Sequence, residues 1–175
     1  MKKFLVIVDM QKDFVDGSLG TEEAVGILPA AEKLIKEFDG EIFVTLDTHG
    51  EDYMDTAEGR KLPVRHCIKG TNGYELDKRI AKALHGKKYT AGPKVTFGSV
   101  DLPKLIKRAA GREKFEIELI GLCTDICVIS NALLLKANFP EVPVSVIAPC
   151  CAGVTPDLHK AALDVMRSCQ IDIKE

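Results

Sequence analysis

Short apolar runs alternate with longer segments of helical periodicity along this chain. Five runs have the length and the apolar content of strands, and a weaker sixth lies near the C-terminus. The predicted strands are residues 4–9, 41–47, 87–91, 115–121, 142–148 and 170–173. Between them the pattern predicts helices over residues 25–38, 74–84, 102–109, 124–138 and 156–166.

The order of these elements predicts the fold class. Continuous apolar strands such as Leu5-Val6-Ile7-Val8 indicate a sheet that is covered on both faces. Regular alternation of strands and helices favours a doubly wound α/β fold with a parallel sheet and right-handed crossovers. A length of 175 residues suits one domain, and no linker or repeat divides it. We therefore expect a single domain over residues 1–175.

Composition and charge narrow the function. Apolar residues make up 46% and charged residues 29% of the chain, and the formal net charge is −2 with no basic block. This balance argues against a nucleic-acid partner. No apolar run approaches the roughly 20 residues of a membrane span, and the N-terminal apolar stretch is too short for a signal peptide. We expect a cytoplasmic protein without a membrane partner, whose six cysteines form no disulfide framework.

Reactive side chains follow the predicted strands. In doubly wound folds, ligands bind beyond the carboxyl ends of the strands. Asp9 ends the first strand, Asp47 and His49 end the second, and Lys94 lies in the loop after the third. Cys127 follows the fourth strand, and Cys150 and Cys151 come after the fifth. The sequence thus predicts an acid, metal-type ligands, a cation and a thiol at one edge of the sheet.

Cys127, Asp9 and Lys94 form a plausible nucleophilic set. Helix N-termini favour thiolate, and an ordinary cysteine has a pKa of about 8.5, so we expect an activated thiol at Cys127. A carboxylate at Asp9 would accept the thiol proton and later protonate a leaving amine, and Lys94 would hold the charges. Each residue taken alone also has a plainer interpretation: a core cysteine, a turn-forming aspartate and a solvated lysine.

A second cluster lies in the long irregular segment between the second strand and the next helix, residues 48–72. Asp47, His49, Glu58 and His66 supply two imidazoles and two carboxylates, which suit Zn, Fe or Mn. Glu58 has two rivals in the same segment, Asp55 and Glu51. The alternative is a solvated acidic loop, but that interpretation does not explain why a histidine stands at position 66.

At this point the chain resembles the isochorismatase-like cysteine hydrolases, and among them the nicotinamidases. The similarity rests on several motifs in the family's order, which are Val8-Asp9-Met10-Gln11-Lys12-Asp13-Phe14, Asp47-Thr48-His49, the segments 62–71 and 94–99, Gly121-Leu122-Cys123-Thr124-Asp125-Ile126-Cys127-Val128, and the segment 156–163. Together these motifs span nearly the whole chain.

The resemblance implies a six-stranded, mostly parallel sheet and assigns roles to individual residues. It makes Asp9, Lys94 and Cys127 the catalytic triad. It implies a cis-type peptide before Cys123, with the backbone N–H groups of Cys123 and Cys127 as the oxyanion hole. It further implies a divalent metal ion on Asp47, His49, His66 and a carboxylate placed at Glu58, a substrate ring nitrogen on that metal, and ring walls formed by Phe14 and Phe97.

The metal-type residues distinguish between the activities that occur within the family. Isochorismatases do not need the thiol and lack this metal set, and carbamoyl-amide hydrolases generally lack the metal set too. Because this chain retains both the thiol and the metal-type residues, the resemblance favours hydrolysis of nicotinamide to nicotinate and ammonia through a thioester. Thr48 and Gly98-Ser99 depart from the usual nicotinamidase pattern by removing aromatic bulk near the ring, so another small amide or carbamoyl compound is the alternative substrate. Family members are often dimers or tetramers, so a homo-oligomer is expected.

Two interpretations outside amide hydrolysis remain open at the level of sequence. Asp9, Asp47 and Lys94 also fit a receiver-like switch module on a doubly wound sheet, although such a module has no use for Cys127, His49 or His66. A catalytically silent family member would retain the motifs without using the thiol.

Overall fold

The computed structural model describes all 175 residues and has a six-stranded sheet at its centre. Its strands are β1 (Lys2–Val8), β2 (Glu41–Asp47), β3 (Tyr89–Lys94), β4 (Phe115–Leu122), β5 (Val144–Ala152) and β6 (Asp172–Lys174). The order across the sheet is β3-β2-β1-β4-β5-β6, and every neighbouring pair is parallel. The predicted doubly wound α/β fold is confirmed.

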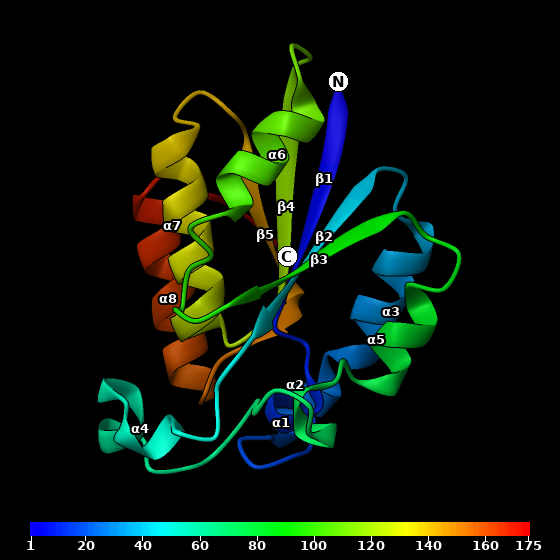
Figure 1. Cartoon of the computed structure of the whole chain (residues 1–175). Helices are drawn as coiled ribbons and strands as arrows, with labels where there is room; N and C mark the ends of the chain where they lie inside the picture. The colour runs from blue at the N-terminus through cyan, green and yellow to red at the C-terminus, as the bar shows by residue number, and fades with distance from the viewer.

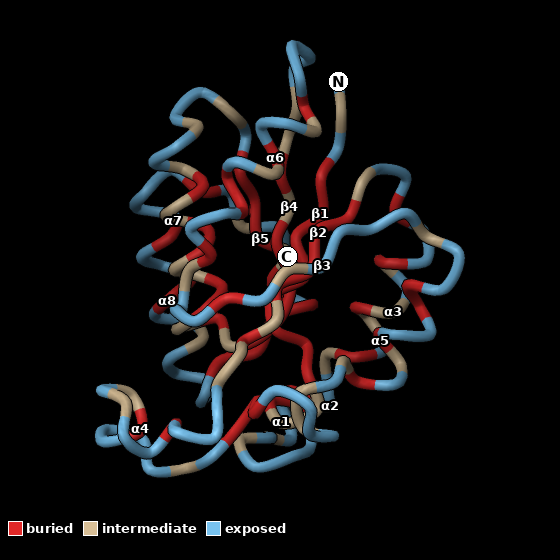
Figure 2. The backbone as a smooth tube through the Cα atoms, in the orientation of Figure 1, coloured by how far each residue is buried: buried red, intermediate tan, exposed pale blue.

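Helices cover both faces of this sheet (Figure 1). On one side lie α3 (Leu28–Glu37) and α5 (Lys78–Ala83). On the other lie α6 (Leu102–Ala110), α7 (Ile129–Asn138) and α8 (Pro156–Ser168). Figure 2 shows that the central strands are buried along most of their length, whereas the outer helix surfaces are exposed. A cluster of 40 buried residues forms the core between these layers, and no helix is long and apolar enough to cross a bilayer.

Short helices gather at the carboxyl ends of the strands, in the lower part of Figure 1. They are α1 (Lys12–Val15), α2 (Glu22–Gly26) and α4 (Ala57–Lys61), with the 3₁₀ turns η1 (Tyr53–Asp55) and η2 (Asn72–Tyr74) nearby in the sequence. The first turn after β4 is a π-helix, η3 (Thr124–Val128), which continues into α7. The segments that the sequence analysis associated with chemistry therefore lie at this end of the sheet.

Several predicted boundaries differ from the structure for identifiable reasons. The helix predicted over residues 25–38 is two helices, because Thr21 caps α2 and Pro29 restarts the chain in the first turn of α3. The segment predicted as irregular contains α4, which Thr56 caps by accepting a hydrogen bond from the Gly59 N–H. The helix predicted over residues 74–84 begins later, at Lys78, because Asp77 is its cap.

Two strands, β3 and β5, continue well beyond their predicted carboxyl ends. β3 is an edge strand, where proline is tolerated, so it continues through Pro93 to Lys94. Lys94 is therefore the last residue of a strand and does not lie in the following loop. β5 continues through Cys150 and Cys151 to Ala152, pairing with the end of β4 after a register shift.

Candidate active site

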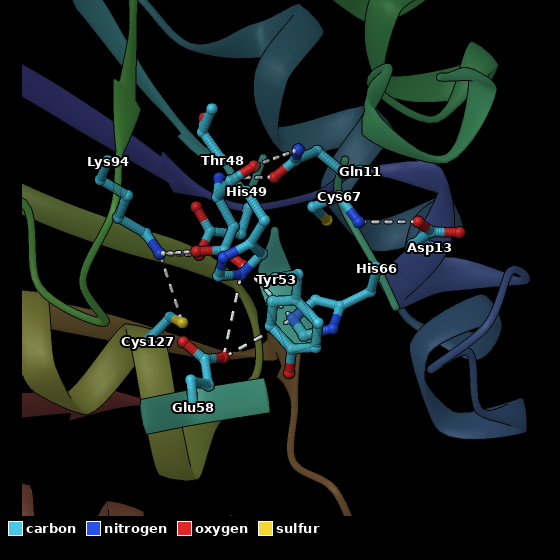
Figure 3. A network of polar contacts seen from close by, with 12 residues as sticks. Gln11, Asp13, Thr48, His49, Tyr53, Glu58, His66, Cys67, Lys94 and Cys127 are labelled. Atoms are coloured by element: carbon cyan, nitrogen blue, oxygen red, sulfur yellow. Dashed lines mark hydrogen bonds and ion pairs between the residues drawn. The ribbon is translucent and has the colours of Figure 1, made fainter. Parts of the chain in front are cut away.

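Asp9, Lys94 and Cys127 meet at the carboxyl end of the sheet. Lys94 projects from the edge strand β3, and its Nζ lies 2.6 Å from Asp9 Oδ2 and 3.5 Å from Cys127 Sγ (Figure 3). All three residues are buried. The structure thus brings together an acid, a cation and a thiol that lie far apart in the sequence, with the ammonium in contact with both other groups.

Asp9 occupies an unusual position directly after β1. Its φ angle is +47°, in the left-handed region that non-glycine residues rarely adopt. Gly121 lies beside this turn on β4, where a Cβ atom would come within 2.1 Å of the Val8 carbonyl oxygen. Complete burial raises the pKa of the Asp9 carboxyl, although the nearby Lys94 ammonium and a 2.6 Å hydrogen bond from the Thr45 hydroxyl oppose this shift.

The two oxygens of Asp9 differ in their partners. Oδ1 accepts the hydrogen bond from Thr45, whereas Oδ2 faces the Lys94 ammonium without an aligned hydrogen-bond donor. A buried polar atom without such a donor is uncommon in folded proteins. Oδ2 is therefore the oxygen with capacity to accept another proton.

The thiol of Cys127 is held in its neutral form. Burial raises its pKa well above the ordinary value, the negative charge of Asp9 raises it further, and only Lys94 acts in the opposite direction among the main influences. The expectation that the helix start would favour thiolate is therefore wrong for this resting geometry. Cys127 lies near the end of the π-helical turn, in an enclosed position where burial and the nearby carboxylates raise the pKa of its thiol.

The metal-type residues form a compact group next to this trio. Single ligand atoms of Asp47, His49 and His66 all lie within 4.8 Å of one another. Asp47 Oδ2 is 2.9 Å from His49 Nε2 and 3.5 Å from His66 Nε2. Glu58 Oε1 is 3.8 Å and 3.7 Å from the same two nitrogens. Its rival Glu51 instead pairs with Arg65, and Asp55 is exposed.

These separations fit a divalent metal ion. Tetrahedral zinc with bonds of about 2.0 Å places its ligand atoms about 3.3 Å apart. The four donor atoms are two imidazole nitrogens and two carboxylate oxygens, a set that suits Zn, Fe or Mn. The Nδ1 of His66 lies 2.8 Å from the Val64 carbonyl oxygen, and with the proton on Nδ1 its Nε2 lone pair would face the cluster.

Asp47 joins the two groups of residues. Its Oδ1 accepts a hydrogen bond from Lys94 at 3.1 Å, while its Oδ2 contacts both histidines. Burial alone would raise the pKa of this carboxyl, but its contacts with the rings of His49 and His66 and the charge of Lys94 lower it below its usual range. Asp47 is therefore ionised and links the ammonium near the thiol to the metal-type cluster.

Three supporting residues did not emerge as site residues from the sequence. Gln11 brackets the backbone of Asp47, donating to its carbonyl at 2.9 Å and accepting from its N–H at 2.7 Å (Figure 3). Asp13 accepts a hydrogen bond from the N–H of Cys67, the residue after His66, at 2.8 Å. Thr45 holds Asp9. Gln11 and Asp13 lie in the first motif of the family resemblance, which gave them no role, and Thr45 has no signal beyond its place in a strand.

A cavity of about 590 Å³ opens onto the thiol and the metal-type cluster. Phe14 and Phe97, predicted to wall the substrate ring, both line it, and so does Cys123 beside Cys127.

The peptide bond between Leu122 and Cys123 is cis, as the resemblance implied. Cys150 and Cys151 are buried in β5 and do not line the cavity. Next to the cavity, His159 Nδ1 lies 2.7 Å from the Thr124 hydroxyl oxygen.

Comparison with known proteins agrees with this geometry. A model of the isochorismatase domain matches residues 3–173. The chain belongs to the isochorismatase domain family. This isochorismatase-family chain is 28% identical, over 181 residues, to the nicotinamidase/pyrazinamidase of Mycobacterium tuberculosis, with 97% of this chain and 96% of that protein covered.

Solved structures of the family extend the comparison. The nicotinamidase/pyrazinamidase of Bacillus subtilis superposes with a TM-score of 0.85 at 28% identity, and both chains are covered completely. The pyrazinamidase of Pyrococcus horikoshii in complex with zinc gives a TM-score of 0.79 at 27% identity, covering 100% of this chain and 99% of that one.

Proposed function

We propose that this isochorismatase-family protein is a metal-dependent cysteine amidase that hydrolyses nicotinamide to nicotinate and ammonia. The observation that carries the proposal is the contact of the Lys94 ammonium with both Asp9 and Cys127, with Asp47 linking this trio to a metal-type cluster. The similarity to nicotinamidases from Mycobacterium tuberculosis and Bacillus subtilis supports the same reaction, hydrolysis of an amide C–N bond.

In this proposal Asp9 first acts as a base. Its Oδ2 takes the proton of the Cys127 thiol as the sulfur attacks the amide carbon and forms a C–S bond. The neighbouring Lys94 ammonium stabilises the negative charge that develops at sulfur and holds Asp9 and Cys127 in position. The backbone N–H groups of Cys123 and Cys127 would donate to the oxygen of the tetrahedral intermediate.

Asp9 then acts as an acid. It returns its proton to the amide nitrogen, the C–N bond breaks, and ammonia leaves a thioester on Cys127. Water attacks the thioester carbon, Asp9 removes a proton from that water, and the same proton restores the thiol when the C–S bond breaks. One water is consumed, and the products are ammonia and the carboxylic acid.

Asp47, His49, His66 and Glu58 would hold a divalent ion, for which zinc, iron and manganese are the candidates. Such an ion supplies a Lewis acid beside the nucleophile and lowers the pKa of a bound water. Phe14 and Phe97 would lie against the substrate ring. Zinc occurs in the complex of the similar Pyrococcus horikoshii pyrazinamidase, which favours zinc as the first ion to test.

Ammonia release from nicotinamide tests the proposed function. Purified protein is stripped of metal and reloaded with zinc, iron or manganese, beside a His66→Ala variant. We expect turnover by at least one metal-loaded form and its loss in the variant. Absence of turnover from the wild type with every ion, under conditions where the metal binds, would contradict nicotinamide as the substrate.

We propose that residues 1–175 form one domain, that the protein forms a homo-oligomer and that it acts in the cytoplasm on a small-molecule amide. A single cooperative unfolding transition would support one domain. Light scattering on the purified protein would measure the oligomeric state, and fractionation of source cells would locate the protein.

A further inference from the structure

The cavity above Cys127 is larger than a single-ring carboxamide requires. Its volume is about 590 Å³, within the range of roughly 300–1,000 Å³ that is typical of pockets for drug-sized ligands. Cys127, Asp47, Glu58 and His66 supply the reactive and metal-type groups that line it. A pyridine ring with one carboxamide would occupy the space beside these groups and leave the rest of the cavity unfilled.

The remaining wall is mainly apolar. It is contributed by α2, α4 and the loops that follow α1, β3 and β5, which lie far apart in the sequence. Beyond the reactive and metal-type groups, Lys61 is the only charged residue in the lining. Ala24 and Ala57 keep this part of the cavity wide, because their side chains are small.

Exposed apolar side chains gather at the mouth of the same cavity. We define the apolar rim as Leu62, Val95, Phe97 and Val154, which line the cavity and have exposed fractions of 38%, 76%, 47% and 44%. Clusters of exposed apolar residues mark binding sites on protein surfaces, because covering them removes apolar area from water. The apolar rim lines the same cavity as the thiol of Cys127. We therefore expect the rim to contact a bound substrate.

We propose that this site, acting through the amidase chemistry proposed above, takes aromatic carboxamides that carry an additional apolar group on the ring. The carboxamide reaches Cys127 at the inner end, and the apolar group lies against the apolar rim. This inference rests on the proposed function and adds the class of substrate. Apolar contacts made equally in the bound substrate and in the transition state lower KM without raising kcat.

Steady-state kinetics on matched amides test the substrate class. Nicotinamide is compared with 5-phenylnicotinamide, 6-phenylnicotinamide and quinoline-3-carboxamide, which retain the carboxamide and the ring nitrogen. Burial of an additional phenyl-sized group predicts a KM about tenfold lower for at least one extended amide, at a similar kcat. If nicotinamide is hydrolysed while every extended amide has a lower kcat/KM than nicotinamide, the inference is overturned and the proposed function survives.

Two variants test whether the apolar rim is responsible. Val154→Ser should lower the ratio of kcat/KM for the best extended amide to that for nicotinamide by about threefold, because it removes part of an apolar contact. Val165→Ser is the matched control, because Val165 is 48% exposed on α8 and does not line the cavity, and it should leave the ratio unchanged. Ala57→Phe, at an exposed position in the first turn of α4, should lower the ratio by about tenfold by filling the outer space.

An unchanged ratio in both Val154→Ser and Ala57→Phe would overturn the inference even if an extended amide is preferred. If wild-type protein hydrolyses neither nicotinamide nor any extended amide, the failure lies with the proposed function. A rim covered by a second copy of the chain would appear as a dimer in light scattering that Val154→Ser dissociates and Val165→Ser does not, and this result would also overturn the inference.

Discussion

At the scale of single residues, the site depends on how burial changes the acid–base properties of a few side chains. Asp9 and Cys127 both have raised pKa values because both are buried, and Lys94 opposes the shift in each case. A protonated thiol beside a carboxylate is the starting state that a general-base mechanism needs. The hydrogen bond from Thr45 lowers the pKa of Asp9 and keeps its carboxylate available.

Thr45→Val tests this role of the hydroxyl. The substitution preserves the shape of the side chain but removes the donor to Asp9, so the pKa of Asp9 should rise further. Because Asp9 must be unprotonated to act as a base, activity rises with pH through its pKa, and the acid limb of the pH–rate profile should move to higher pH. We expect kcat/KM at neutral pH to fall by about tenfold, as for loss of a hydrogen bond to a charged group.

Thr90→Val serves as the control for this experiment, because Thr90 is exposed on β3. It should leave both the rate and the acid limb unchanged. A Thr45→Val enzyme whose acid limb stays at the wild-type pH would show that the hydroxyl does not tune Asp9.

Residues that take part directly in the proposed chemistry could be predicted from the sequence. Residues that only hold those groups in place could be predicted less well. Cys127, Lys94 and the two histidines stood out through their joint placement near strand ends and in the long segment after the second strand, although Cys127 and Lys94 each had a plainer interpretation when taken alone. Thr45 and Gln11 gave no such signal, because a threonine in a strand and a glutamine after one are common. Their importance depends on which backbone or carboxylate they face, and only the folded arrangement determines that.

At the scale of elements, the short segment after β1 supports the metal-type cluster from two sides. Gln11 fixes the backbone of Asp47 at the end of β2, and Asp13 fixes the N–H of Cys67 beside His66. Cys67 has a φ angle of +46°, so this loop adopts a conformation that benefits from an external contact. The same segment begins directly after Asp9, so it connects the acid to the metal ligands along the chain.

Asp13→Ala is expected to weaken metal binding. Outer contacts that orient metal ligands typically change metal affinity by about 10–100-fold when removed. Competition with a chromophoric zinc chelator measures that affinity without any need for turnover. Asp13→Asn retains a side-chain oxygen that can accept the Cys67 hydrogen bond, so it should restore most of the affinity; equal affinities in Asp13→Ala and wild type would contradict the positioning role.

Element types were predictable because apolar periodicity differs between strands and helices. All six strands and the main covering helices lie where the pattern placed them. The predicted boundaries that were wrong concern short segments. β3 continues through Pro93 because proline is tolerated at the sheet edge. The other case is α4, one short capped turn in a polar segment. Edge position depends on strand order, which a single sequence does not reveal directly.

At the scale of the whole molecule, the parallel sheet brings residues from four strands to one edge. Residues near positions 9, 47, 94 and 127 converge because their strands are adjacent in the order β3-β2-β1-β4. That convergence followed from the fold class, whereas the distances, the linking position of Asp47 and the width of the cavity did not. Those features depend on side-chain packing among segments that are remote in the sequence.

Metal binding should stabilise the whole fold. A ligand that binds only the native state at about 100 times its Kd adds about 2.7 kcal/mol to the free energy of unfolding. For a chain of this size, that corresponds to a rise in Tm of about 5–10 °C. Differential scanning fluorimetry with and without zinc measures the shift, which should disappear in His66→Ala. The exposed His85→Ala is the control and should retain it; an equal shift in both variants would exclude His66 as a ligand.

The central claim is that the thiol of Cys127 performs the hydrolysis. The most direct measurement is ammonia release from nicotinamide by metal-reloaded Cys127→Ala, beside wild type and Cys169→Ala, which replaces an exposed cysteine remote from the cavity lining. We predict full activity for Cys169→Ala and no detectable turnover for Cys127→Ala with its metal still bound. Turnover by Cys127→Ala comparable to that of the wild type would contradict the account.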